Sequence, residues 1–365
     1  MIPGIITRSA ICAALLLTGS SSAWPAHILH APEGGEVRGV VIGIDQYPNL
    51  DGAAQLRGAV ADARDIAGAL KAAGVPDANV RTLTDGAAVR SRVIEEMDRL
   101  VDESKSGDLA IVAYSGHGMR VPAYKRWDRL IRSTLQSQIL MSNFGPSVEN
   151  GHEIIVDGEM QAWFARLDAK GVDVLVVMDT SYAHAARRCP CVPLSGRNMK
   201  ARRQSGLLVD DKIHDSFAPI PMTQKEARAD VDKLPHVTFF AGATEESTVP
   251  EMNGIDHADP AAVRGALSYF MARAIGGEAS QAGAVTRAQL FKFLAANVRE
   301  ATEGRQFIDF GPRTESDDAL QRAVFRIDDD AAGGDEKRPD PGLQTCCAQP
   351  RNLQIKPKAV PGGER

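Results

Sequence analysis

Short runs of β-branched and aliphatic residues alternate along the chain with stretches of helical periodicity, and this alternation limits the possible folds most. The first run, 37–44 (VRGVVIGI), is continuously apolar, as in a strand covered on both faces. Comparable strand-like runs cover 80–83, 109–114, 172–178, 237–241 and 324–327. Apolar residues at helical spacing cover 54–73, 89–101, 154–167, 265–275 and 286–301. We therefore expect an α/β fold with a parallel sheet and helices on both faces.

The charge balance argues against a nucleic-acid partner. The chain has 365 residues, a formal net charge of −5 and 44% hydrophobic residues. This length suits one large α/β domain or two modest ones. Because the chain carries no global basic field, we expect no nucleic-acid binding.

The N-terminus has the pattern of a secretory signal peptide. Arg8 is the only charge before an apolar stretch at 10–17, and small residues follow up to Ala23. We expect residues 1–23 to be cleaved off as a signal peptide and 24–36 to form a linker; a disordered apolar tail is the alternative. No later run is long enough for a membrane span. The expected product is exported, periplasmic or secreted, and has no membrane anchor after cleavage.

Four cysteines remain after Cys12 leaves with the signal peptide, namely Cys189, Cys191, Cys346 and Cys347. Export makes disulfides plausible, and we expect bridges between the first two and the last two. A metal site is the alternative, although the spacing fits no common zinc pattern. The C-terminal segment 328–365 is polar and rich in proline, glycine and aspartate, which predicts a flexible tail.

Polar motifs follow the third and fourth predicted strands, where ligands bind in parallel sheets. The first motif is 115–118 (SGHG), in which glycines flank His117 and let its imidazole project over the sheet edge. The second is 179–181 (DTS), which places Ser181 at the end of the neighbouring strand. The pair could form a nucleophile–base dyad. The alternatives are a structural histidine and a helix cap at 179–181.

Several motifs in their order and spacing resemble the caspase-like domain of metacaspases and their bacterial relatives, the orthocaspases, in peptidase family C14. They are 43–47 (GIDQY), 58–63 (GAVADA), 114–118 (YSGHG), 155–159 (IVDGE), 241–243 (AGA) and 265–270 (GALSYF). The resemblance covers roughly residues 37–310, and the joint spacing is more specific than any one motif. It implies a caspase-like (caspase-haemoglobinase) fold with a mainly parallel six-stranded sheet, in a peptidase domain over 37–327.

The resemblance also implies roles for individual residues. The family's catalytic histidine corresponds to His117, and its nucleophilic cysteine corresponds to Ser181. The family's pocket for a basic side chain corresponds to Asp62, Ser115 and Asp179. An anionic pocket suits a peptide or protein substrate with arginine or lysine. The alternative for Asp62 is a solvated helix face.

Serine at the nucleophile position changes the expected chemistry. A thiol ionises far more readily, whereas serine needs a base that a third group, usually a carboxylate, holds in place. No acid in the sequence is obviously placed to orient His117, and Tyr182 and His184 also depart from the family pattern. We expect an impaired peptidase that binds basic peptides or a partner peptidase. The alternatives are an endopeptidase that cuts after arginine or lysine with a Ser181–His117 dyad, and a non-catalytic scaffold.

The remaining expectations concern regulation and assembly. Calcium dependence occurs in some metacaspases, and Asp157 and Asp173 are the candidate ligands here; otherwise we expect no metal and no cofactor. The loop 187–203 has six basic residues and no acid, and it falls where metacaspases often carry self-cleavage sites. A solvated loop is the plainer alternative. A monomer is favoured.

Overall fold

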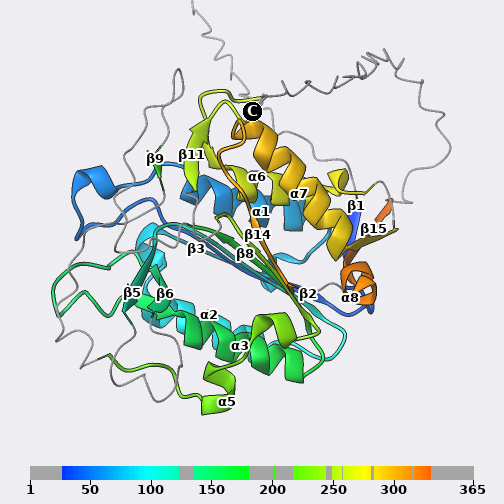
Figure 1. Cartoon of the computed structure of the whole chain (residues 1–365), viewed down its shortest axis with the longest axis horizontal. Coiled ribbons are helices and arrows are strands. Elements are labelled where there is room, and N and C mark those ends of the chain that lie inside the picture. The colour runs from blue at the N-terminus through cyan, green and yellow to red at the C-terminus, as the bar shows by residue number, and fades with distance from the viewer. Residues whose placement is uncertain are drawn as a thin grey trace, which may run out of the picture. The chain divides into compact units, whose positions relative to one another are not determined.

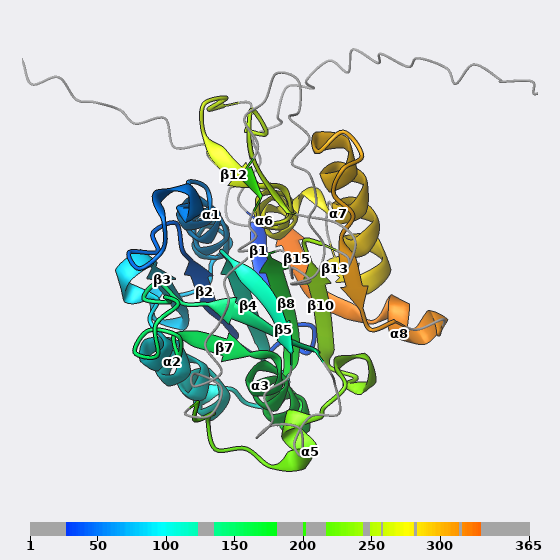
Figure 2. The ribbon, with the colours of Figure 1, turned by 60° about the vertical axis from the view of Figure 1, so that its left-hand side comes forward.

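The computed structural model describes residues 27–122, 135–180, 200–201, 217–243, 249–256, 258–280, 283–313 and 316–329. The central element is a six-stranded sheet in the order β14-β10-β8-β4-β2-β3 (Figures 1 and 2). Its strands are β2 (Val37–Gly43), β3 (Val80–Thr84), β4 (Leu109–Ser115), β8 (Asp173–Asp179), β10 (Val237–Ala241) and β14 (Asp309–Gly311). All neighbours pair in parallel except β14, which is antiparallel to β10. The predicted α/β fold with a largely parallel sheet is confirmed.

Helices cover both faces of this sheet (Figure 1). On one face lie α2 (Arg90–Glu103), α3 (Asp157–Ala169) and the short α5 (Gln224–Ala227). On the other lie α1 (Ala59–Ala72), α6 (Ala266–Arg273), which continues into the π-helical turn η5 (Ala274–Glu278), and α7 (Arg287–Ala301). Short helical turns complete the chain: η1 (Gly52–Ala54), η2 (Asp77–Asn79), η3 (Asp85–Ala87), η4 (Val231–Lys233) and α8 (Asp317–Gln321).

Successive residues of each central strand point into opposite cores. Val40 and Ile42 lie in the core with α2 and α3, whereas Val41 between them lies in the core with α1, α6 and α7. Because side chains alternate across a strand, a strand buried on both faces must be apolar at every position. This requirement produces the continuous apolar runs of the sequence.

Three smaller sheets border the central one. The first consists of β1 (His27–His30), β15 (Ala323–Asp329) and β13 (Gly283–Thr286). The second consists of β5 (Gly118–Pro122), β6 (Leu135–Leu140) and β7 (Ile154–Val156). The third consists of β12 (Val263–Gly265), β11 (Pro250–Asn253) and β9 (Lys200–Ala201).

The structure differs from the sequence predictions at several boundaries. The sixth central strand is β14, because the predicted strand at 324–327 forms part of β15 in a separate sheet. The predicted helix 154–167 starts with strand β7 and becomes helical only at Asp157, and the predicted helix 54–73 starts at Ala59. The segment predicted as linker contains β1, which pairs with β15, and residues 328–329 belong to β15 rather than to the tail.

Other predictions fall on residues outside the described part of the chain. These are the signal peptide, the four cysteines, most of the basic loop and the tail from residue 330 onward. Among the described residues, no helix has the length and apolar character needed to cross a membrane.

A buried ion pair joins the two helices of the α2–α3 face. Arg90, at the start of α2, contacts both carboxylate oxygens of Glu159 in α3, at 2.6 and 2.9 Å. Glu159 is fully buried and also accepts a hydrogen bond from the backbone N–H of Ile220 at 2.9 Å. The same carboxylate therefore fixes α2, α3 and the segment that leads into α5.

We expect Glu159→Ala to destabilise the protein by about 3 kcal/mol or more, because it leaves the Arg90 guanidinium without its buried partner. Urea unfolding measures the change. The matched control is Glu149→Ala at an exposed position, which should change the free energy of unfolding by less than about 0.5 kcal/mol. Equal effects of the two substitutions would show that the pair does not hold the helices together.

Candidate active site at the carboxyl edge of the sheet

The carboxyl ends of three parallel strands lie level with one another. Gly43, the last residue of β2, pairs in register with Ser115, the last residue of β4, and Ser115 pairs in turn with Asp179, the last residue of β8. Segments that leave these strands therefore start side by side at one edge of the sheet. This edge is where the sequence placed the site.

His117 is held at this edge by two groups from the segment after β2. Its Nε2 lies 2.6 Å from the carbonyl oxygen of Ala54, at the end of η1. The ring of Tyr47 packs against the imidazole with centroids 4.8 Å apart, and the Tyr47 hydroxyl accepts a hydrogen bond from the His117 backbone N–H at 2.8 Å. Only 1% of the histidine is exposed. The imidazole is therefore fixed by protein contacts.

Gly116 is required by this packing. A Cβ atom on that residue would lie 2.6 Å from the hydroxyl of Tyr114 and 2.8 Å from the hydroxyl of Tyr47. The Tyr114 hydroxyl also donates to the carbonyl oxygen of His117 at 2.7 Å. Two tyrosines thus hold the turn on either side of the histidine, and no larger residue fits between them.

The hydrogen bond to Ala54 determines the tautomer of His117. A carbonyl oxygen can only accept, so Nε2 must carry the proton. In the neutral ring the lone pair is then on Nδ1, which is the atom that can take a proton from a nucleophile. Among the described residues, the group that orients Nε2 is a neutral carbonyl. Sequence reasoning found no acid to orient His117, and the structure shows that a backbone atom orients it.

The three residues predicted as a basic-residue pocket come together next to His117. Asp62 in α1 accepts a hydrogen bond from the Ser115 hydroxyl at 2.8 Å, and Asp179 lies opposite Ser115 on the adjacent strand. Both aspartates are fully buried. The alternative interpretation, in which Asp62 lies on a solvated helix face, is therefore wrong. The role of the three residues in binding a basic side chain stays a prediction.

The N-terminus of α6 satisfies both buried carboxylates. The backbone N–H of Gly265, the N-cap residue, donates to Asp62 at 2.9 Å, and the N–H of Ser268 in the first turn donates to Asp179 at 2.9 Å. The first N–H groups of a helix lack partners within the helix and carry partial positive charge. One helix end thus offsets the burial of two negative charges.

A family model for the caspase domain matches residues 38–306, which is more than half of the chain. The chain belongs to the caspase domain family. Among solved structures, protein GSU0716 from Geobacter sulfurreducens matches with a TM-score of 0.50 and 16% identity over 79% of this chain and 98% of that chain. The Drosophila initiator caspase Dronc matches with a TM-score of 0.40 and 9% identity over 85% of this chain and 92% of that chain. No curated protein matches.

Within this caspase domain, the predicted nucleophile position falls outside the described residues. Asp179 and Thr180 are fully buried, and Ser181, Tyr182 and His184 are not described. The strand register pairs Asp179, two residues before position 181, with Ser115, two residues before His117. The roles of Ser181 and His117 as a dyad stay predictions.

Sequence reasoning missed one acid that shapes the caspase-domain site. Glu251 in β11 is buried, and its carboxylate accepts hydrogen bonds from the backbone N–H groups of Arg57, at 3.0 and 3.1 Å, and of Gly58, at 2.7 Å. These groups lie between Ala54 and the start of α1, so Glu251 fixes the segment that carries the orienting carbonyl. Its partners are 194 and 193 residues away, and no local sequence signal connects them.

The two candidate calcium ligands lie on different elements. Asp157 begins α3 and accepts a hydrogen bond from the backbone N–H of Ser137 at 3.3 Å. Asp173 begins β8 and contacts the Arg322 guanidinium at 2.6 Å. In the described ranges, no cluster of three or more histidine, cysteine, aspartate or glutamate side chains is arranged to hold a metal ion. Calcium dependence stays a prediction.

We expect neutral His117 to be the Nε2-protonated tautomer, because its Nε2 faces a carbonyl oxygen. Long-range ¹H–¹⁵N correlation spectra of ¹⁵N-labelled protein report the tautomer, and His117→Gln assigns the signal. The same protein unfolded in urea is the reference, where the ring is free to exchange tautomers. A folded His117 with its proton on Nδ1 would contradict the orienting role of Ala54.

Proposed function

We propose that this caspase-domain protein binds polypeptide segments that carry arginine or lysine and cleaves them poorly or not at all. The observation that carries the proposal is the hydrogen bond from His117 Nε2 to the carbonyl oxygen of Ala54, combined with serine at position 181. We further propose that residues 1–23 direct export, so that the protein acts in the periplasm or outside the cell.

A carbonyl-oriented histidine suits a cysteine better than a serine. A thiolate beside an imidazolium forms an ion pair, and this pair needs the ring to be oriented but needs no further negative charge. A serine reaches its transition state only as the histidine becomes positively charged, and a buried carboxylate normally stabilises that charge. The carbonyl of Ala54 fixes the tautomer of His117 but supplies no full negative charge. A cysteine thiol would therefore be reactive beside this histidine, and Ser181 takes its place.

The group of Asp62, Ser115 and Asp179 supports binding of a basic side chain. Ser115 and Asp179 end two adjacent strands, and Asp62 lies in the first turn of α1. Ser115 donates to Asp62 and is two residues before His117 in the sequence. Gly265 and Ser115 donate hydrogen bonds to Asp62, and Ser268 donates one to Asp179. Two carboxylates held this close together favour a cation such as a guanidinium or ammonium group over a neutral or anionic one.

A working serine endopeptidase is the second candidate, and the tautomer of His117 favours it. With the proton on Nε2, Nδ1 can accept the proton of a serine hydroxyl. This geometry meets one requirement of a Ser181–His117 dyad. This candidate comes second because the group described at Nε2 is a neutral carbonyl, whereas a serine mechanism normally uses a carboxylate.

We expect Ser181→Cys to cleave fluorogenic peptides that end in arginine or lysine at least about 100-fold faster than the natural protein, because the thiolate restores the ion pair with His117. Assays run with and without Ca²⁺, and Ser181→Ala is the control for contaminating peptidase. If the natural protein cleaves these peptides and Ser181→Ala does not, the protein is a serine endopeptidase and the proposal of impaired catalysis is wrong.

Binding can be measured separately from cleavage. We expect Asp62→Asn to weaken binding of a fluorescein-labelled arginine peptide by roughly tenfold or more in fluorescence anisotropy, because a charge-assisted hydrogen bond is lost. Asp77→Asn is the matched control, since its side chain is 82% exposed and lies in η2. Circular dichroism checks that both variants fold. Equal weakening in both would point to net charge and not to a pocket.

A further inference from the structure

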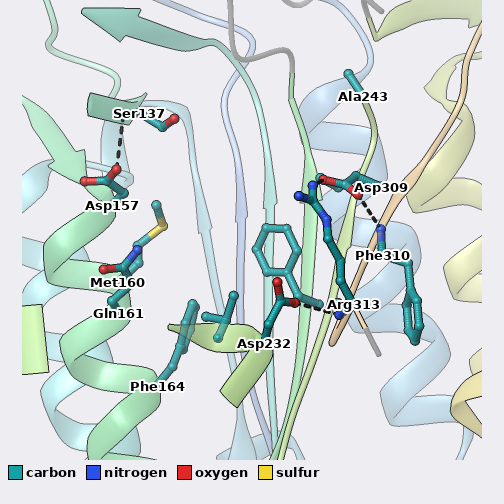
Figure 3. Close-up of a pocket in the computed structure, with 14 residues that line it drawn as sticks. Ser137, Asp157, Met160, Gln161, Phe164, Asp232, Ala243, Asp309, Phe310 and Arg313 are labelled. Atoms are coloured by element: carbon teal, nitrogen blue, oxygen red, sulfur yellow. Dashed lines mark hydrogen bonds and ion pairs between the residues drawn. The ribbon is translucent and has the colours of Figure 1, made fainter. Parts of the chain in front are cut away.

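A separate hollow of about 350 Å³ lies between α3 and the β10–β14 edge of the sheet (Figure 3). We call it the β10–α3 pocket. Its apolar walls come from Met160 and Phe164 of α3 and from Phe239 and Ala241 of β10. Its described lining includes neither His117 nor Asp62, Ser115 or Asp179 of the predicted basic-residue pocket. The volume lies at the small end of ligand sites and suits one long side chain.

Carboxylates line this pocket. Asp157 lies at the start of α3, Asp232 in η4 and Asp309 at the start of β14 (Figure 3). Arg313 also lines the pocket and contacts Asp309 at 2.6 Å. Among the described residues of the lining, three negative charges and one positive charge give a formal charge of −2.

Backbone hydrogen bonds hold two of these carboxylates in place. Asp232 accepts from the backbone N–H of Arg313 at 2.7 Å, and Asp157 accepts from the backbone N–H of Ser137 at 3.3 Å. Asp157 and Asp232 therefore belong to fixed elements on opposite sides of the hollow (Figure 3). The half-buried Phe239 also lines it. Such an arrangement is organised before any ligand arrives.

The combination of walls and charges selects a chemical class. An anion would meet a net negative lining, and a purely apolar group would desolvate carboxylates without compensation. A lysine or arginine side chain has an aliphatic stem for the walls and a cationic head for the carboxylates. A cation near the faces of Phe164 and Phe239 gains a further attraction from the rings.

The position of the pocket favours a side chain carried by a polypeptide. Ala241, which lines the pocket, pairs in register with Met178 of β8, and Met178 pairs with Tyr114 of β4, three residues before His117. Two strand spacings of about 4.8 Å separate these strand ends. An extended peptide covers about 3.3 Å per residue, so a few residues span that distance.

We propose that the β10–α3 pocket is a second recognition site that takes one arginine or lysine side chain of a bound polypeptide. The choice of a cation follows from the pocket alone. The choice of a polypeptide rests on the proposed function. The test therefore measures binding at the pocket itself and does not depend on peptide cleavage.

Agmatine, an aliphatic chain with a guanidinium head, is the first probe. We expect it to shift the ¹³C-methyl signal of Met160, which Met160→Leu assigns. In Asp157→Asn/Asp232→Asn, agmatine affinity should fall by roughly tenfold or more for the loss of two carboxylates. In the matched control Asp77→Asn, affinity should stay within about twofold because that residue is remote and exposed. No Met160 shift at millimolar agmatine, or equal losses in both variants, would overturn the site.

A peptide of glycine and serine with one central arginine is the second probe. We expect it to shift Met160 as agmatine does, and the same peptide with neutral citrulline should leave Met160 unchanged. A shift with agmatine but none with the arginine peptide would overturn the polypeptide assignment. Asp62 does not line this pocket. A Met160 shift that persists in folded Asp62→Asn while anisotropy binding falls therefore separates this site from the proposed one at Asp62.

Discussion

The burial of two carboxylates at the carboxyl edge of the sheet is the constraint on which the site depends. Asp62 and Asp179 are fully buried, and an unpaired charge in such a place costs several kcal/mol. The N-terminus of α6 meets that cost through the N–H groups of Gly265 and Ser268. Since α6 follows directly on β12, the same hydrogen bonds position the β11–β12 hairpin, whose Glu251 then fixes the segment before α1.

That chain of contacts ends at the imidazole. Glu251 holds the backbone of Arg57 and Gly58. These residues closely follow η1, which ends at Ala54, and the Ala54 carbonyl sets the tautomer of His117. The histidine is thus oriented by backbone geometry that charged residues of other segments maintain. Under the proposed function, this arrangement suits the ion pair of a cysteine better than the charged transition state of a serine.

The sequence pattern predicted the strands that are buried on both faces. It missed strands whose position depends only on hydrogen bonding to a neighbouring strand. β2, β4, β8 and β10 matched their predicted ranges closely, because burial on two faces makes a run apolar throughout. The three residues of β14 carry no such pattern, and their place follows from pairing with β10. The strand ends predicted that the motifs after β4 and β8 start at the same edge of the sheet, and Ser115 pairs in register with Asp179 there. The roles of these residues stay predictions. Ala54 acts through a backbone oxygen and Glu251 through distant partners, so neither leaves a mark in the sequence.

The structural role of the acids changes how their presence is interpreted. In the sequence, Asp62 and Asp179 match the family's pocket while Ser181 replaces its nucleophile. This pattern suggested a protein that still binds substrate but has lost catalysis. Both acids also hold α6 to the sheet edge, so the fold requires them whether or not a substrate binds. Their presence alone therefore does not argue for a working pocket, and a scaffold role would retain them equally. At the β10–α3 pocket, Asp157 accepts hydrogen bonds from the backbone N–H groups of Ser137 and Gly158, and Asp232 accepts one from that of Arg313. These acids also have structural partners, so stability has to be measured beside affinity in variants of either site.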